Sequence, residues 1–143
     1  IAAVREYEKR LKGYCKLTLL ELPEEKLPNA PSQAQINAAL EKEAQAIFSK
    51  LPKRATLVAL CIEGKELSSE QLAQKFQQWA TSGVSAIALV IGSSYGLHPL
   101  VKQQAALRLS MSPMTFPHHL ARVMLLEQVY RAFKINEGSL YHK

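Results

Sequence analysis

The stretch IALVIGSSYGL, residues 87–97, decides how this chain folds. Its first five residues are an unbroken apolar run, which is typical of a parallel strand covered on both faces, so we expect a central strand over 86–91. The run stops at Gly92, and small and polar residues follow as far as Gly96. Because a glycine after a strand lets a ligand approach the main chain, this pattern predicts a strand followed by a binding turn.

A second loop of the same kind lies just downstream. Residues 109–119 read LSMSPMTFPHH and lead into a long helical pattern over 118–135. Two loops that present main-chain amides at the ends of neighbouring strands are what an open α/β sheet uses to hold a small polar ligand. We therefore expect the functional site at these two loops.

The remaining chain alternates between strand and helix patterns. Two helices have capping boxes, formed by Ser32 with Gln35 and by Ser68 with Gln71, and Gly83 ends the second of these helices. The other expected elements are strands over 14–22, 56–62 and 108–110, a loop over 63–67, and helices over 1–12 and 98–107. This alternation predicts one α/β domain over residues 1–143, with a mostly parallel sheet and flanking helices.

The helix expected over 118–135 is apolar around most of its circumference. Val123, Met124, Leu125 and Leu126 are consecutive, so they cannot all lie on one face of a helix. A helix of this kind in a small domain needs a partner surface, most simply a second copy of the chain. We expect a homodimer.

The charge of the chain favours an anionic partner. The chain contains eighteen Lys and Arg residues and twelve acidic residues, all of them Glu, which gives a net charge of +6. The stretch between Glu70 and Glu127 contains both loops and no carboxylate. The cations within it are Lys75, Lys102, Arg108 and Arg122. RNA is the common partner of a small basic protein, and the alternative is a merely basic surface.

Several classes of protein are disfavoured. The Gly92 turn matches neither the dinucleotide fingerprint nor the phosphate-binding loop, which argues against a nucleotide-binding domain. The chain has no Asp to orient a serine triad, and the adjacent His118 and His119 do not have metal-ligand spacing, so we expect no metal. Cys15 and Cys61 lack CxxC spacing, and neither a leader nor an apolar stretch of about 20 residues is visible, so we expect a cytoplasmic protein without membrane contact.

The motifs together resemble one family. The similarity is dense from Thr56 to Lys143 and weaker upstream; it is carried by Val90-Ile91-Gly92, Tyr95-Gly96-Leu97, Leu109-Ser110, Met114-Thr115-Phe116-Pro117-His118, Arg122-Val123, residues 127–135 and Tyr141-His142-Lys143. These residues are similar to the pseudouridine N3-methyltransferases of the ribosomal large subunit (23S rRNA), which belong to the SPOUT class of α/β-knot methyltransferases. The resemblance implies a C-terminal trefoil knot.

The resemblance also implies a cofactor, S-adenosyl-L-methionine. It would contact Leu60, Gly92 and one loop, formed by Met111, Ser112, Pro113, Met114, Thr115 and Phe116. The implied reaction is methyl transfer to N3 of a pseudouridine in 23S rRNA, on assembled ribosomes. The alternatives are a knotted methyltransferase for another RNA base and a basic RNA-binding module without catalysis.

Neither loop contains a carboxylate that would take the N3 proton. The hypothesis is that His142 takes it and that Arg122 and Lys143 hold phosphate or stabilise the developing anion, with Tyr141, His142 and Lys143 facing the RNA. Three departures from the family's pattern stand out. The usual first strand is missing, which we interpret as an incomplete N-terminus; Ser93 replaces a glycine, and Lys143 replaces the Arg of some relatives.

Overall fold

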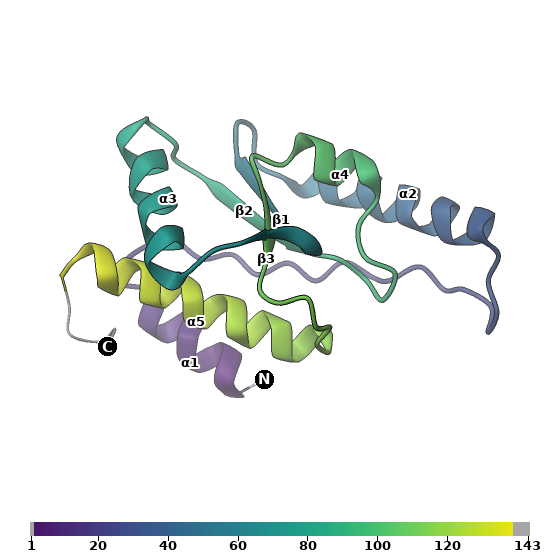
Figure 1. Cartoon of the computed structure of the whole chain (residues 1–143), viewed down its shortest axis with the longest axis horizontal. Coiled ribbons are helices and arrows are strands. Elements are labelled where there is room, and N and C mark those ends of the chain that lie inside the picture. Colours follow the sequence, from purple (N-terminus) through teal and green to yellow (C-terminus); the bar gives the residue numbers. More distant parts are fainter. Residues whose placement is uncertain (1, 139–143) are drawn as a thin grey trace. The chain divides into compact units, whose positions relative to one another are not determined.

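The structure is a computed structural model that describes residues 2–138. The elements in that range are α1 (Ala2–Leu11), α2 (Gln33–Lys50), β1 (Thr56–Glu66), α3 (Ser69–Thr81), β2 (Ile87–Ile91), α4 (Pro99–Gln104), β3 (Leu107–Ser110) and α5 (His118–Asn136) (Figure 1). They fall into two compact units. We call residues 20–65 and 85–113 the sheet unit, and residues 2–19, 66–84 and 114–138 the helical unit.

The sheet has the strand order β2-β1-β3. β1 and β2 are parallel, with Thr56 opposite Ile87 and Leu60 opposite Ile91. This confirms the predicted α/β class with a parallel sheet. The expectation that 86–91 is the central strand is wrong: β1 is central and β2 lies at an edge, with all five of its residues only half-buried. Both strands are apolar runs, so hydrophobicity alone did not distinguish centre from edge.

The core of the sheet unit lies between β1, α2 and α4. Ala44 of α2 and Val101 of α4 pack against Leu57 and Ala59 of β1, and Leu97 completes this buried cluster. β1 also runs to Glu66, so the loop expected over 63–67 is largely strand. α4 ends at Gln104, earlier than expected, because residues from Leu107 onward join the sheet as β3.

The helix ends follow the predicted chemistry. The Ser32 hydroxyl accepts a hydrogen bond from the Gln35 amide at 3.1 Å, and the Ser68 hydroxyl accepts one from the Gln71 amide at 3.1 Å. The Oε1 of each glutamine in turn accepts a hydrogen bond from the backbone amide of its serine, so both capping boxes are confirmed. Gly83, at φ +93°, follows α3 in the left-handed conformation that favours glycine.

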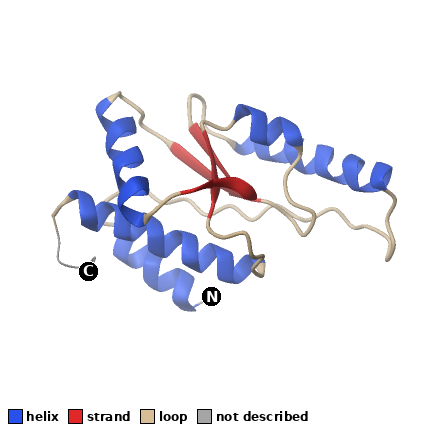
Figure 2. Cartoon of the chain, in the orientation of Figure 1, coloured by secondary structure: helices blue, strands red, loops and turns tan. Residues whose placement is uncertain are grey.

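The strand expected over 14–22 is absent. Residues 15–28 form neither helix, strand nor turn, and Figure 2 shows them as an extended loop. Leu19 and Leu20 of this segment are 38% and 60% exposed. The residue types of this segment favour a strand, but a strand also needs a neighbouring strand with which its backbone can form hydrogen bonds. The three-stranded sheet of the described chain does not include this segment.

The helical unit is built around α5. α1 and α3 both pack on it: Tyr14, just after α1, stacks on Phe133 at 5.4 Å between ring centroids, and Phe76 of α3 lies 6.2 Å from the same ring. The Ser69 hydroxyl donates to Gln128 Oε1 at 2.6 Å, and Asn136 Nδ2 donates to the Ala73 carbonyl at 3.0 Å. These contacts fix α3 along α5. The single-domain organisation and the trefoil knot stay predictions.

Candidate functional site

The carboxyl end of β2 is the first part of the candidate site. Ile91, its last residue, pairs with Leu60 of β1, and both side chains are half-buried. Because the two strands are parallel, Gly92 leaves the sheet directly beside Leu60. The structure therefore brings together two of the residues that the resemblance assigns to the cofactor.

The turn after Gly92 folds back on itself. The Gly96 amide donates to the Ser93 carbonyl at 2.8 Å, and Gly96 has φ +87°. A Cβ on Gly92 would lie 2.5 Å from the carbonyl carbon and oxygen of Gly96 and 2.9 Å from Leu97 Cγ. A glycine is therefore needed at position 92 because the main chain of Gly96 packs against it. The sequence pattern had indicated a different reason, the close approach of a ligand.

A carboxylate from a distant segment reaches this turn. Glu24 Oε1 accepts a hydrogen bond from the Ser94 amide at 2.9 Å, across 70 residues of sequence. Next to it, the Glu25 amide donates to Glu43 Oε2 at 3.0 Å. Residues 24–28, with Ser94 and Tyr95, line an open cavity of about 360 Å³. Sequence reasoning missed this acid, and no motif or spacing in the chain indicates it.

The segment after β3 is the second part of the candidate site. Ser110 is only 3% exposed, and its hydroxyl lies 3.0 Å from the Ile62 carbonyl oxygen and 3.1 Å from the Ser112 carbonyl oxygen. It can donate to either oxygen, so it ties residues 110–112 to β1. Met111 and Ser112 are half-buried and Pro113 is exposed. Since β1 lies between β2 and β3, the two candidate loops follow the two strands that flank it.

The other predicted residues belong to the helical unit or lie outside the described chain. Met114 and Thr115 are exposed, Met114 at 70%, and Phe116 is half-buried. Arg122 is half-buried on α5. Tyr141, His142 and Lys143 lie outside the described residues.

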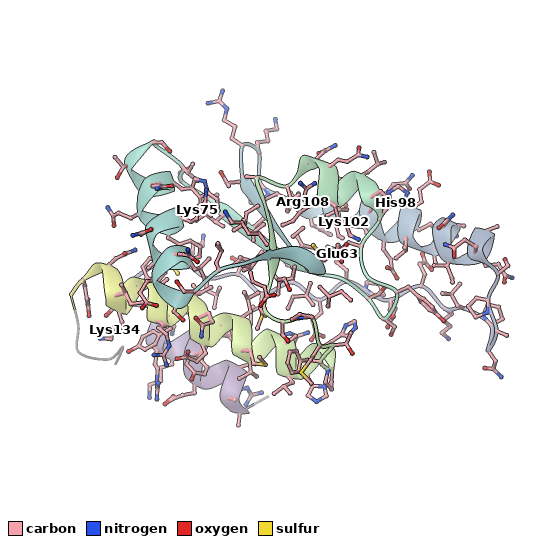
Figure 3. All side chains as sticks on the ribbon, viewed as in Figure 1. Glu63, Lys75, His98, Lys102, Arg108 and Lys134 are labelled. Carbon is pink, nitrogen blue, oxygen red and sulfur yellow. The ribbon has the colours of Figure 1, made fainter. Side chains whose placement is uncertain are left out.

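The cations around the sheet are partly neutralised. Figure 3 shows Lys102 of α4 beside Glu63 of β1, and the two form an ion pair. The hydrogen bond from Lys102, followed by one from a backbone amide, holds the pKa of Glu63 below its ordinary value. Lys102 belongs to the stretch between Glu70 and Glu127 that contains no carboxylate, but its charge is neutralised by Glu63, which lies before that stretch. Arg108 of β3 is exposed.

Two further side chains near α4 have local roles. His98 precedes Pro99 and caps the helix, with Nδ1 accepting from the Leu100 amide at 3.1 Å. Burial, followed by the negative charge of Glu63, raises the pKa of the Cys61 thiol. A thiol with a raised pKa is mostly protonated at neutral pH and therefore reacts slowly as a nucleophile.

Residues 2–138 contain no group of three or more His, Cys, Asp or Glu side chains able to hold a metal ion. No helix within the same range combines the length and apolar character needed to cross a bilayer.

A family model described as "Predicted SPOUT methyltransferase" matches residues 1–142. The chain therefore belongs to the SPOUT methyltransferase family, which is the family of the 23S rRNA pseudouridine N3-methyltransferase. Membership implies S-adenosyl-L-methionine-dependent methylation of RNA. Such a cofactor needs accessible apolar side chains, and Leu60, Ile91 and Met111 are each only half-buried.

Proposed function

We propose that this protein methylates N3 of a pseudouridine in 23S rRNA, on assembled ribosomes and with S-adenosyl-L-methionine as the methyl donor. The observation that carries the proposal is the family match over residues 1–142, because it spans both strand-end loops. The motifs of residues 90–97 and 109–135, which resemble the pseudouridine N3 enzymes, favour this substrate within the family.

The cofactor-binding residues are Leu60, Gly92 and residues 111–116. Bound S-adenosyl-L-methionine supplies an electrophilic methyl group, and the protein supplies position. The Ser94 amide donates to Glu24, and the Ser110 hydroxyl lies within hydrogen-bond distance of the Ile62 and Ser112 carbonyl oxygens, so the starts of the two loops are tied to other parts of the sheet unit. A preorganised site of this kind lowers the entropic cost of aligning the methyl group with the base.

The N3 nitrogen carries a proton that must leave before or during the attack on the methyl group. In the proposal His142 accepts it, and Arg122 and Lys143 hold phosphate or stabilise the developing ring anion, while Tyr141 lies against the RNA. A homodimer places the tail of one subunit at the pocket of the other. Two other functions remain in competition, a knotted methyltransferase for another RNA base and a non-catalytic RNA-binding module.

The test has two stages. Titration calorimetry with S-adenosyl-L-methionine should give saturable heat; no heat at millimolar cofactor would favour the RNA-binding module. Intact ribosomes from a strain that lacks the modification are then incubated with protein and cofactor, and their rRNA is digested and analysed by mass spectrometry. A gain of one methyl group on pseudouridine supports the proposal, and methylation of a different base supports the alternative target.

Deletion of residues 141–143 tests the role of the tail. Because the proposed base and RNA contacts lie there and the cofactor loops do not, the truncated protein should bind S-adenosyl-L-methionine within about twofold of the full chain and lose methylation. Normal methylation by the truncated protein would show that His142 is not the base.

A further inference from the structure

One flank of α1 carries cations that no other part of the described chain uses. Arg5, Lys9 and Lys12 are separated by four and three residues, so they follow one another along one side of α1 and the turn after it. All three are exposed, and no carboxylate within residues 2–138 forms an ion pair with any of them. We call these three residues the α1 stripe.

The neighbouring cations have different roles. Arg10, on the other flank of α1, pairs with Glu6 at 3.5 Å and lies 5.3 Å from the Tyr7 ring and 5.7 Å from the Tyr130 ring. Such contacts join α1 to α5 through the aromatic side chains. Arg10 therefore contributes to packing, and the stripe does not.

Lys134 of α5 is used in the same way as Arg10. Its Nζ lies 3.0 Å from Glu137 Oε1 and 5.6 Å from the Tyr14 ring centroid. The Tyr14 hydroxyl donates to the same carboxylate oxygen at 2.9 Å. The helical unit thus pairs the cations that hold its helices together and leaves the α1 stripe facing solvent.

We propose that the α1 stripe binds the sugar–phosphate backbone of the RNA substrate. The inference rests on the proposed function in taking RNA as the partner. The three cations are spread over about 10 Å along the helix axis. That spacing suits a linear polyanion, which carries a row of charges, better than a single small anion. Backbone contacts of this type position a protein on its RNA and add no base specificity, so the stripe would determine affinity for the ribosome.

The test compares two triple variants with equal loss of charge. Arg5→Gln/Lys9→Gln/Lys12→Gln removes the stripe; Lys42→Gln/Lys50→Gln/Lys53→Gln, on α2 and the turn after it, is the control, because those lysines are also exposed and unpaired in the described chain. Glutamine keeps a helix propensity close to that of Lys and Arg. Binding to intact ribosomes is measured by sedimentation at about 50 to 200 mM salt.

The slope of log affinity against log salt should become shallower by about 2 to 3 in the stripe variant and stay at the wild-type value in the control, since each phosphate contact contributes about 0.7 to 0.9. Cofactor affinity by calorimetry should be unchanged in both variants, which also shows that they are folded. The three single variants should each account for about a third of the change in slope.

Equal slopes for wild type, stripe variant and control would overturn the proposal, and methylation of the ribosomes by all three would leave the proposed function standing. Weaker binding by the stripe variant with an unchanged slope would also overturn it, in favour of a contact with ribosomal protein. Failure of the wild type to bind ribosomes at all would overturn the stripe and the proposed function together.

Discussion

Gly92 has no room for a side chain, and the reason lies in the turn that it begins. In Gly92→Ala the new Cβ would meet the Gly96 main chain at 2.5 Å, so the turn would have to move. We expect the free energy of unfolding to fall by about 1 to 3 kcal/mol, as for other overpacked sites, and cofactor affinity to fall with it. Urea denaturation and calorimetry measure the two effects.

Gly13→Ala is the matched control at the residue scale. A Cβ at Gly13 meets nothing within 4 Å, and its φ lies outside the left-handed region. Alanine there should be neutral or stabilise the fold by up to about 1 kcal/mol. Equal destabilisation by both substitutions would contradict the role assigned to the Gly92 turn.

Single residues also show how far the sequence could predict the site. Gly92 was identified because a glycine after an apolar run is a local pattern, although its structural cause proved to be the Gly96 main chain. Glu24 was missed because its contact with Ser94 spans 70 residues, and no local pattern records such a pairing. The tail residues 141–143 stay predictions.

At the scale of elements, the pair of Glu63 and Lys102 joins β1 to α4. The pKa of Glu63 is lower in the folded state than in the unfolded state, mainly because Lys102 donates to it. Its contribution to stability is therefore present above the unfolded pKa and is lost as the pH falls through the folded pKa. For a pair with a Glu63 side chain 55% exposed, we expect no more than about 1 kcal/mol.

Lys102→Gln should raise the pKa of Glu63 toward its ordinary value, because the main hydrogen bond to the carboxylate changes from charged to neutral. A carbon-detected NMR titration of the glutamate carboxyls measures the shift directly. Lys75→Gln is the control, since Lys75 forms no ion pair in the described chain and should leave Glu63 unchanged. If the pKa of Glu63 is the same in Lys102→Gln as in the wild type, Lys102 is not the cause of its lowered pKa.

Helices were easier to predict from the sequence than strands. Each capping box, at Ser32 and at Ser68, is defined by residue types within four consecutive positions, so it can be recognised locally, and both were confirmed. The segment 14–22 and the order of the strands depend on which edge each strand meets, which is a property of the assembled sheet. The apolar runs of β1 and β2 therefore predicted strands and failed to predict which one is central.

For the whole molecule, the predicted homodimer can be tested through α5. Leu120, in its first turn, is 43% exposed although α1 and α3 pack on this helix. If the proposed twofold contact uses α5, sedimentation equilibrium should give twice the 15.9 kDa chain mass, and Leu120→Glu should shift the protein toward monomer. Leu20→Glu, at a residue 60% exposed in the sheet unit, should leave the dimer intact. A monomeric wild type at every concentration would refute the dimer.

The interleaving of the two compact units limits how this protein can be dissected. The chain passes from one unit to the other between residues 19 and 20, 65 and 66, 84 and 85, and 113 and 114. Neither unit is a continuous stretch of sequence, so no terminal truncation isolates one of them. Gene fragments that end at any of these junctions would carry an incomplete copy of both units, so they should yield insoluble or protease-sensitive products.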